Sequence, residues 1–425
     1  MSSGKKRYGI LGLIFFTVVI NYLDRTNISV AAPAIMESLN FDSVQMGYIF
    51  GAFGLTYSIL QIPGGILVDR IRARLLYSLM LGLWSFATLL QGLVSSFVAL
   101  VGLRASIGVF EAPSYPCNNA IVTRWFPDHE RASAIAIYTS GQFIGLAFLF
   151  PVLTELQVWI GWRGLLITSG VIGIFWAVIW YIFYRDPDQH KSVSEKELDF
   201  IRAGGGLSAI KKEKKPFSWS DLRIALGYRK LWGLYIGQFC MGSVSIFFLT
   251  WFPTYLVEYR GLDFIKSGYL ASLPFLAAFG GILLSGFISD RLLKKGYSAS
   301  IARKVPVLTG LLLSMAIMGA NFTDDISLII TFLAVAFFGN GIASIGWIFV
   351  SSLAPKHLVG LIGGVFNFIG STTGFIIPAA IGYLVQEGDF APALYFISGL
   401  TVLGIFSYLF IVGKVERIEL KQVAT

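Results

Sequence analysis

The most constraining feature of this sequence is a regular series of long apolar runs separated by short polar segments. A helix rises about 1.5 Å per residue, so about 20 apolar residues cross the roughly 30 Å hydrocarbon core of a bilayer. Only 13% of the residues are charged and the mean hydropathy is +0.72, whereas soluble domains average about 25% charged residues. The chain has more apolar residues than one buried core could hold, so we expect an all-α, multi-pass membrane protein.

Twelve runs are long enough to span a bilayer, and one polar stretch divides them six plus six. The first six lie near residues 8–29, 45–68, 75–95, 97–118, 133–155 and 161–184, and the second six near 231–256, 267–289, 304–320, 325–350, 357–383 and 391–413. We therefore expect an N-terminal six-helix bundle over residues 1–184, a linker over 185–230, and a C-terminal six-helix bundle with a tail over 231–425. Inside the linker we expect a surface helix near 194–202, followed by a flexible triple glycine at 204–206.

The distribution of basic residues predicts the orientation. Of the 33 Lys and Arg residues, 28 fall in the two termini, the linker and alternate loops, three fall in the opposite loops, and Arg25 and Arg104 fall within spans. Loops rich in Lys and Arg remain in the cytoplasm, so both termini and the linker are expected there. Because topology accounts for the net charge of +9, we expect no nucleic-acid partner.

Four ionisable side chains interrupt the apolar runs: Asp24, Arg25, Arg104 and Glu111. A charge at the centre of a bilayer costs roughly 2.5–3.5 kcal/mol on insertion scales. Arg104 and Glu111 are separated by about two helical turns, so they share one helix face. The four charges could form buried ion pairs that hold helices together. Alternatively, an arginine could bind a carboxylate substrate, and the acids could load and release protons as their surroundings change.

A short motif also repeats at matching places in the two halves. Gly65-Ile66-Leu67-Val68-Asp69-Arg70 closes the second span, and Gly286-Phe287-Ile288-Ser289-Asp290-Arg291 closes the eighth. The glycine permits close helix approach, and the aspartate can pair with basic groups or cap a neighbouring helix. The matched positions indicate an internal repeat rather than two unrelated turns.

This motif and the six-plus-six plan resemble the major facilitator superfamily, except that Arg72 stands where that pattern usually has Gly. A finer similarity is to the anion:cation symporter branch, and within it to bacterial galactonate-type sugar-acid/proton symporters. It rests on Asn21-Tyr22-Leu23-Asp24-Arg25, Gln61-Ile62-Pro63-Gly64-Gly65, Gly108-Val109-Phe110-Glu111-Ala112-Pro113, Phe248-Leu249-Thr250-Trp251-Phe252-Pro253 and Gly364-Val365-Phe366-Asn367-Phe368. The resemblance implies two six-helix bundles in a bacterial inner membrane and alternating access to one site.

The resemblance also implies roles for individual residues. Arg25 would bind the substrate carboxylate, Asp24 and Glu111 would carry protons, and Arg104 would tune them. The gating motif would comprise Asp69, Arg70, Asp290 and Arg291. Positions matching the sugar-acid site are Tyr22, Tyr57, Gln142, Ser344, Trp347 and Asn367, with Trp251 and Asn340 as weaker candidates. Gly346 departs from the galactonate-type pattern, which has a hydroxyl residue there, so the identity of the sugar acid stays open.

The expected function is import of a monocarboxylate sugar acid, galactonate or a related hexonate, together with protons. The alternatives are a transporter of hexuronate, hexarate or another organic anion, and a membrane sensor without net flux. We expect a monomer without cofactor or metal. His129, His190 and His357 lack metal-ligand spacing, as do the two cysteines. An enzyme is the least supported class, because no nucleophile–base pair stands out in the sequence.

Overall fold

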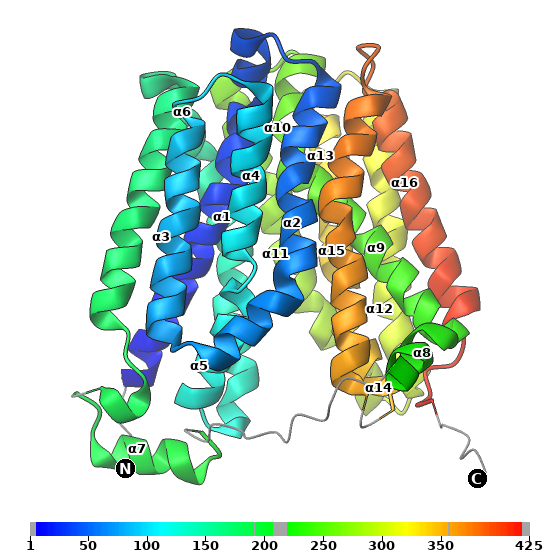
Figure 1. Ribbon diagram of the computed structural model, residues 1–425. Coiled ribbons are helices and arrows are strands. Elements are labelled where there is room, and N and C mark those ends of the chain that lie inside the picture. The colour runs from blue at the N-terminus through cyan, green and yellow to red at the C-terminus, as the bar shows by residue number, and fades with distance from the viewer. Residues whose placement is uncertain (1–5, 191, 207–218, 356–357, 419–425) are drawn as a thin grey trace. The chain divides into compact units, whose positions relative to one another are not determined.

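The computed structural model describes residues 6–190, 192–206, 219–355 and 358–418 (Figure 1). The side chains of Asp69, Ala132, Trp219, Ser220, Asp290 and Ala299 are outside this description. Every regular element in the described ranges is helical. A membrane-spanning helix satisfies its own backbone hydrogen bonds, which an isolated strand in lipid cannot do. The all-α class expected from the apolar runs is confirmed.

Within the described ranges, eleven helices are long and apolar enough to cross a membrane. One of them, α6 (Asp128–Phe183), has 56 residues, and Gly161 interrupts it with φ 70° and ψ 172°. Glycine adopts this backbone conformation without the steric cost that other residues meet. The two parts of α6 correspond to the runs predicted at 133–155 and 161–184, so α6 holds two spans and the predicted twelve are accounted for.

The chain folds as two compact units. Unit 1 contains Met1–Phe41 and Ala52–Lys215, and unit 2 contains Asp42–Gly51 and Pro216–Thr425. The helices of unit 1 are α1 (Lys6–Leu39), α2 (Ser43–Arg70, from Ala52 onward), α3 (Ala73–Gln91), α4 (Phe97–Glu111), α5 (Ser114–Trp125), α6, η1 (Pro187–Gln189) and α7 (Glu195–Ala203). Helix α6 packs along α1 and α3, and α3 packs against α4.

The helices of unit 2 repeat this organisation. They are α8 (Trp219–Gly227), α9 (Arg229–Thr250), α10 (Phe252–Thr254), η2 (Tyr255–Tyr259), α11 (Phe264–Lys294), α12 (Ala299–Ser314), η3 (Met315–Phe322), α13 (Ile326–Ala343), α14 (Gly346–Leu353), α15 (Val359–Leu384), α16 (Ala391–Phe406) and η4 (Ser407–Ile411). Helix α13 packs against α11 and α12, and α9 packs against α15 and α16.

Both halves interrupt their fourth span. In unit 1, α4 ends at Glu111 and α5 begins at Ser114, with Pro113 between them. Proline cannot donate the backbone hydrogen bond that would continue the helix. In unit 2, α13 ends at Ala343 and α14 begins at Gly346. Interrupted helices in transporters expose backbone and side-chain polar groups at the middle of the membrane, and several predicted site residues lie at these two places.

The linker helix α7 is anchored to unit 1 by a buried charge cluster. Arg7 Nε lies 2.9 Å from Glu130 Oε2 and Arg7 Nη1 lies 3.4 Å from Glu197 Oε1. Glu197 also accepts from the backbone N–H of Arg7 at 3.2 Å, and neither Arg7 nor Glu197 is accessible to solvent by more than 3%. The predicted surface helix near 194–202 therefore exists, but one side of it is buried.

The triple glycine after α7 makes defined hydrogen bonds, while its expected flexibility stays a prediction. The amides of Gly205 and Gly206 donate to the carbonyls of Arg202 and Ile201 at 3.0 and 2.8 Å, and Gly205 has a φ of 83°. This is the hydrogen-bonding pattern with which glycine commonly ends a helix. The three glycines therefore cap α7.

The close crossing of α2 and α4 leads to a prediction about packing. A Cβ at Gly108 would lie 2.2 Å from Thr56 Oγ1 and 2.4 Å from the Phe53 carbonyl oxygen, whereas a Cβ at Gly102 of the same helix would have nothing within 4 Å. Overpacking typically costs about 1–3 kcal/mol. We expect Gly108→Ala to lower the melting temperature of the detergent-purified protein by several degrees and Gly102→Ala to leave it unchanged. Equal melting temperatures for the two variants would contradict this packing.

Candidate functional site

The centre of the candidate site is an ion pair between α1 and α4. Arg25 Nε donates to Glu111 Oε1 at 2.6 Å, and Arg25 Nη2 donates to the same oxygen. The Arg25 side chain is 11% exposed, while that of Glu111 is fully buried. The second carboxylate oxygen, Oε2, is buried without a hydrogen-bond partner. The Arg25 side chain therefore keeps a small exposed surface, whereas the Glu111 side chain keeps none.

Three aromatic rings surround the Arg25 guanidinium. Its central carbon lies 5.0 Å from the ring centre of Tyr22, 5.1 Å from that of Phe53 and 4.8 Å from that of Tyr57. Phe53 and Tyr57 are four residues apart on α2, and their rings stack at 5.4 Å. Each such cation–π contact is worth about 0.5–2 kcal/mol. The rings stabilise the positive charge and exclude water from around it, which strengthens its attraction for an anion.

Asp24, the residue before Arg25, faces a different set of partners. Its Oδ2 accepts from Trp84 Nε1 of α3 at 2.9 Å, and its Oδ1 is buried without a partner. Arg104 Nη1 donates to the main-chain carbonyl of Asp24 at 3.3 Å rather than to its carboxylate. The Asp24 carboxylate is thus fully buried with a neutral donor and no contacting cation. That Arg104 tunes the two acids stays a prediction.

A polar group next to Arg25 extends the site toward α6. Tyr22 donates through its hydroxyl to Gln142 Oε1 at 2.9 Å, and the Tyr115 hydroxyl lies 3.5 Å from the same oxygen. Short polar groups beside aromatic faces are what a polyhydroxylated ligand requires. Unit 1 therefore brings together seven of the residues expected from sequence: Tyr22, Asp24, Arg25, Tyr57, Arg104, Glu111 and Gln142.

Two of the three predicted site residues of unit 2 lie at the α13–α14 interruption, and the third lies on α15. Ser344 is exposed directly after α13, and Trp347 in the first turn of α14 is 55% exposed. A Cβ at Gly363 of α15 would lie 2.8 Å from the Trp347 ring, so this glycine allows the indole to lie on α15. Asn367 follows Gly363 by four residues and is half-buried. Ser344, Trp347 and Asn367 thus occupy one region of unit 2.

Gln238 of α9 belongs to the same region, and the sequence analysis missed it. A Cβ at Gly346 would lie 3.2 Å from its Oε1, and a Cβ at Gly370 would lie 2.8 Å from its Cγ. The side chain is half-buried, so two glycines on α14 and α15 make room for a partly accessible amide. A lone glutamine within the apolar run Tyr235–Cys240 was the available signal.

The other candidates from sequence have packing roles or lie outside the description. Trp251 is fully buried and donates through Nε1 to the Pro378 carbonyl at 3.1 Å, which is a packing role. Asn340 Nδ2 donates to Ser245 Oγ at 2.7 Å. Arg70 is exposed, and Arg291 lies 5.7 Å from the Phe287 ring. The side chains of Asp69 and Asp290 are outside the described residues, so the gating pairs stay predictions.

In the part of the chain that the structure describes, no group of three or more His, Cys, Asp or Glu could hold a metal ion. His190 instead packs edge-on against Trp125 at 5.7 Å. Burial and the nearby Lys6 charge lower the pKa of His190 from its ordinary value, which favours the neutral ring. His129 packs in the same way against Phe200 at 6.0 Å, and His357 lies outside the described residues.

The contact between Trp84 and Asp24 can be tested by a double-mutant cycle. Removing one partner of a buried hydrogen bond leaves the other unsatisfied, at about 1–3 kcal/mol. We therefore expect Trp84→Phe and Asp24→Leu each to lower thermal stability. The melting temperature of the double variant should fall by less than the sum of the decreases in the two single variants, because neither partner is then left unpaired. Melting temperatures that fall additively would show that the two side chains do not interact.

Comparison with known proteins places the chain among membrane transporters. The family model of the Major Facilitator Superfamily matches residues 14–378. The chain is 49% identical over 420 residues to a D-galactonate transporter of Escherichia coli O6:H1, covering 98% of this chain and 97% of that protein. It is 41% identical over 431 residues to the probable galactarate/D-glucarate transporter GudP of Escherichia coli K12, covering 98% and 96%.

The fold has close counterparts among solved structures. A bacterial homologue of the human lysosomal transporter Spinster superposes with a TM-score of 0.74 at 20% identity, over 97% of this chain and 96% of that one. At this identity the likeness concerns the fold alone. With the family model and the full-length relatives, it establishes that this multi-pass membrane protein belongs to the Major Facilitator Superfamily.

Proposed function

We propose that this protein imports a monocarboxylate sugar acid, galactonate or a related hexonate, by proton-coupled symport. The observation that carries the proposal is the partly exposed Arg25 side chain, whose guanidinium is held by Glu111 and surrounded by Tyr22, Phe53 and Tyr57. A guanidinium presents two parallel N–H donors that match a carboxylate. The substrate class is supported by the names of relatives: a D-galactonate transporter, a probable L-galactonate transporter and a probable galactarate/D-glucarate transporter.

Proton coupling follows from competition for Arg25. Glu111 uses Arg25 as its counter-ion, and a substrate carboxylate at the same guanidinium would weaken or replace that pair. A buried carboxylate without a counter-ion is costly, and binding a proton removes the charge. Asp24 is already buried with no contacting cation. In this scheme Glu111 takes up a proton as substrate binds Arg25, and Asp24 holds a second site for protons.

The remaining parts of the proposed transport scheme rest on the sequence analysis. Two bundles, residues 1–184 and 231–425, alternate in exposing the site to the two sides of a bacterial inner membrane, with linker 185–230 and both termini in the cytoplasm. Asp69, Arg70, Asp290 and Arg291 control the cytoplasmic gate. Ser344, Trp347, Asn367 and Gln238 contact the sugar hydroxyls. The protein acts as a monomer, without cofactor or chemical conversion of the substrate.

A hexarate transporter is the second candidate, because relatives at 39–41% identity bear the name of galactarate/D-glucarate transporters. A diacid needs a second cation for its second carboxylate. Arg104, the guanidinium that contacts the neighbouring residue Asp24, is only 2% exposed and is bonded to the Asp24 carbonyl. Because Arg104 is buried and already bonded, Arg25 has no second free cation beside it among the described residues of the site, which favours a monoacid.

Uptake into proteoliposomes tests the substrate and the role of Arg25. We expect labelled galactonate to accumulate when an inward proton gradient is imposed and only to equilibrate without one. Arg25→Lys should reduce uptake at least tenfold, because an ammonium cannot reproduce the two-donor geometry. The control is Arg202→Lys, a surface arginine whose side chain is 60% exposed. Accumulation of glucarate in place of galactonate would favour the second candidate instead.

Replacing Glu111 tests the coupling step separately from binding. In Glu111→Gln the side-chain amide oxygen can still accept a hydrogen bond from Arg25. The amide cannot take up and release a proton as a carboxylate does. We expect it to abolish gradient-driven accumulation while retaining exchange of external labelled galactonate for internal galactonate. Glu37→Gln, at an exposed position near the end of α1, is the matched control. Unchanged gradient-driven uptake by Glu111→Gln would remove Glu111 from the coupling mechanism.

A further inference from the structure

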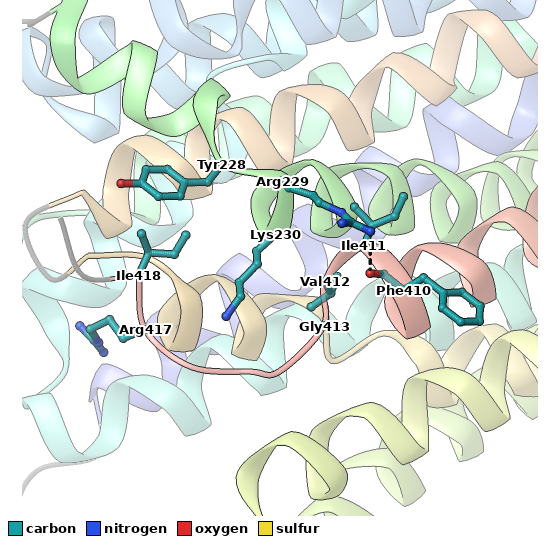
Figure 2. A pocket seen from close by; sticks show the side chains of 9 residues that line it. All are labelled: Tyr228, Arg229, Lys230, Phe410, Ile411, Val412, Gly413, Arg417 and Ile418. Atoms are coloured by element: carbon teal, nitrogen blue, oxygen red, sulfur yellow. Dashed lines mark hydrogen bonds between the residues drawn. The ribbon is translucent and has the colours of Figure 1, made fainter. Parts of the chain in front are cut away.

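A pocket in unit 2 lies apart from every residue assigned to the transport site. Its volume is about 510 Å³. It is formed where α9 begins and where the chain leaves η4 at the end of the last span, and it is lined by Tyr228, Arg229, Lys230, Phe410, Ile411, Val412, Gly413, Arg417 and Ile418. Figure 2 shows Lys230 pointing into the space that the segment from Val412 to Arg417 encloses.

The pocket carries concentrated positive charge. Arg229, Lys230 and Arg417 line it, and Lys304 of α12 lies close enough to Lys230 for their charges to repel. Within the described residues, none of these side chains forms an ion pair with a carboxylate. Three cations that line the pocket, with a fourth near Lys230 and no carboxylate paired to any of them among the described residues, favour binding of an anion.

The backbone adds to this charge. Arg229 and Lys230 are the first two residues of the 22-residue helix α9, and Tyr228 supplies no side-chain cap. The first turn of a helix carries a partial positive charge and unpaired N–H groups, which attract phosphate. Arg229 Nη2 is fixed by donation to the Phe410 carbonyl at 3.2 Å (Figure 2), whereas no hydrogen bond of the Lys230 ammonium occurs among the described residues.

An apolar surface continues from the charged pocket along the last span. Phe410 borders the pocket and is 58% exposed. Further exposed apolar side chains on α16 and η4 are Val402, Leu403, Phe406 and Leu409. The rings of Phe406 and Phe410 are 4.7 Å apart. A small inorganic anion would not contact this apolar surface. A molecule with a phosphate headgroup and acyl chains would contact both the charged pocket and the apolar surface.

We propose that this pocket binds the phosphate of an anionic glycerophospholipid, with its acyl chains along the exposed face of α16 and η4. Basic pockets at the ends of membrane helices commonly recognise such headgroups. Lys230 supplies the movable charge that contacts the phosphate. Arg229 and Arg417 shape the pocket, since both also bond to backbone carbonyls, of Phe410 and Ser351.

Native mass spectrometry of delipidated protein, titrated with phosphatidylglycerol or with phosphatidylcholine of the same acyl chains, tests the proposal. We expect the first phosphatidylglycerol to bind Lys230→Gln roughly fivefold more weakly than wild type, the loss expected for one basic residue at an anionic lipid surface. Lys230→Arg should restore binding. The control is Lys294→Gln, an exposed cation at the end of α11, which should bind like wild type.

Three results would overturn the proposal that this pocket binds an anionic phospholipid. Equal phosphatidylglycerol binding by wild type and Lys230→Gln would show that the lipid binds elsewhere. Equal retention of phosphatidylcholine would show that charge does not select the ligand. Displacement of the lipid by millimolar inorganic phosphate would make the pocket a site for free anions. Each readout is independent of transport, so failure of the proposed transport function would leave the result interpretable.

Discussion

The ion pair between Arg25 and Glu111 is the interaction on which the candidate site depends. Both groups lie within membrane spans, where an isolated charge is costly, so each is tolerated because the other is present. The pair also joins α1 to α4 next to the α4–α5 interruption. A ligand that competes for Arg25 therefore disturbs the contact that holds these helices together. Binding, protonation and helix movement can be linked through this one guanidinium.

The two halves share an interrupted helix, a feature that exposes polar groups within the membrane. Each interrupts its fourth span, after Glu111 in unit 1 and around Ser344 in unit 2. Their chemistry differs, however. Unit 1 contributes the charges and most of the aromatic rings, while the described region of unit 2 around Ser344, Trp347 and Gln238 contributes neutral polar groups and one indole. Among these described residues, the charged side chains lie in unit 1.

Much of the fold could be predicted from the sequence, because bilayer thickness fixes the length of an apolar run and charge bias marks its ends. The intramembrane charges could also be identified from the sequence, because a charged residue stands out within an apolar run. Their partners could not: nothing in the run around Trp84 distinguishes an indole that donates to Asp24 from one that only packs. Gln238 was missed because its role depends on Gly346 and Gly370, which are distant in sequence. The triple glycine at 204–206 was expected only as a flexible segment, although its place directly after the predicted helix also suits a helix cap.

The most direct test of the central claim is the number of protons exchanged when galactonate binds. Calorimetric titrations at one pH in buffers of different ionisation enthalpy give this number for wild type and for Glu111→Gln. If the substrate carboxylate takes Arg25 from Glu111, wild type should take up protons on binding, and the variant should bind galactonate with up to about one proton fewer. Identical proton uptake by the two proteins, or none by wild type, would contradict the competition for Arg25.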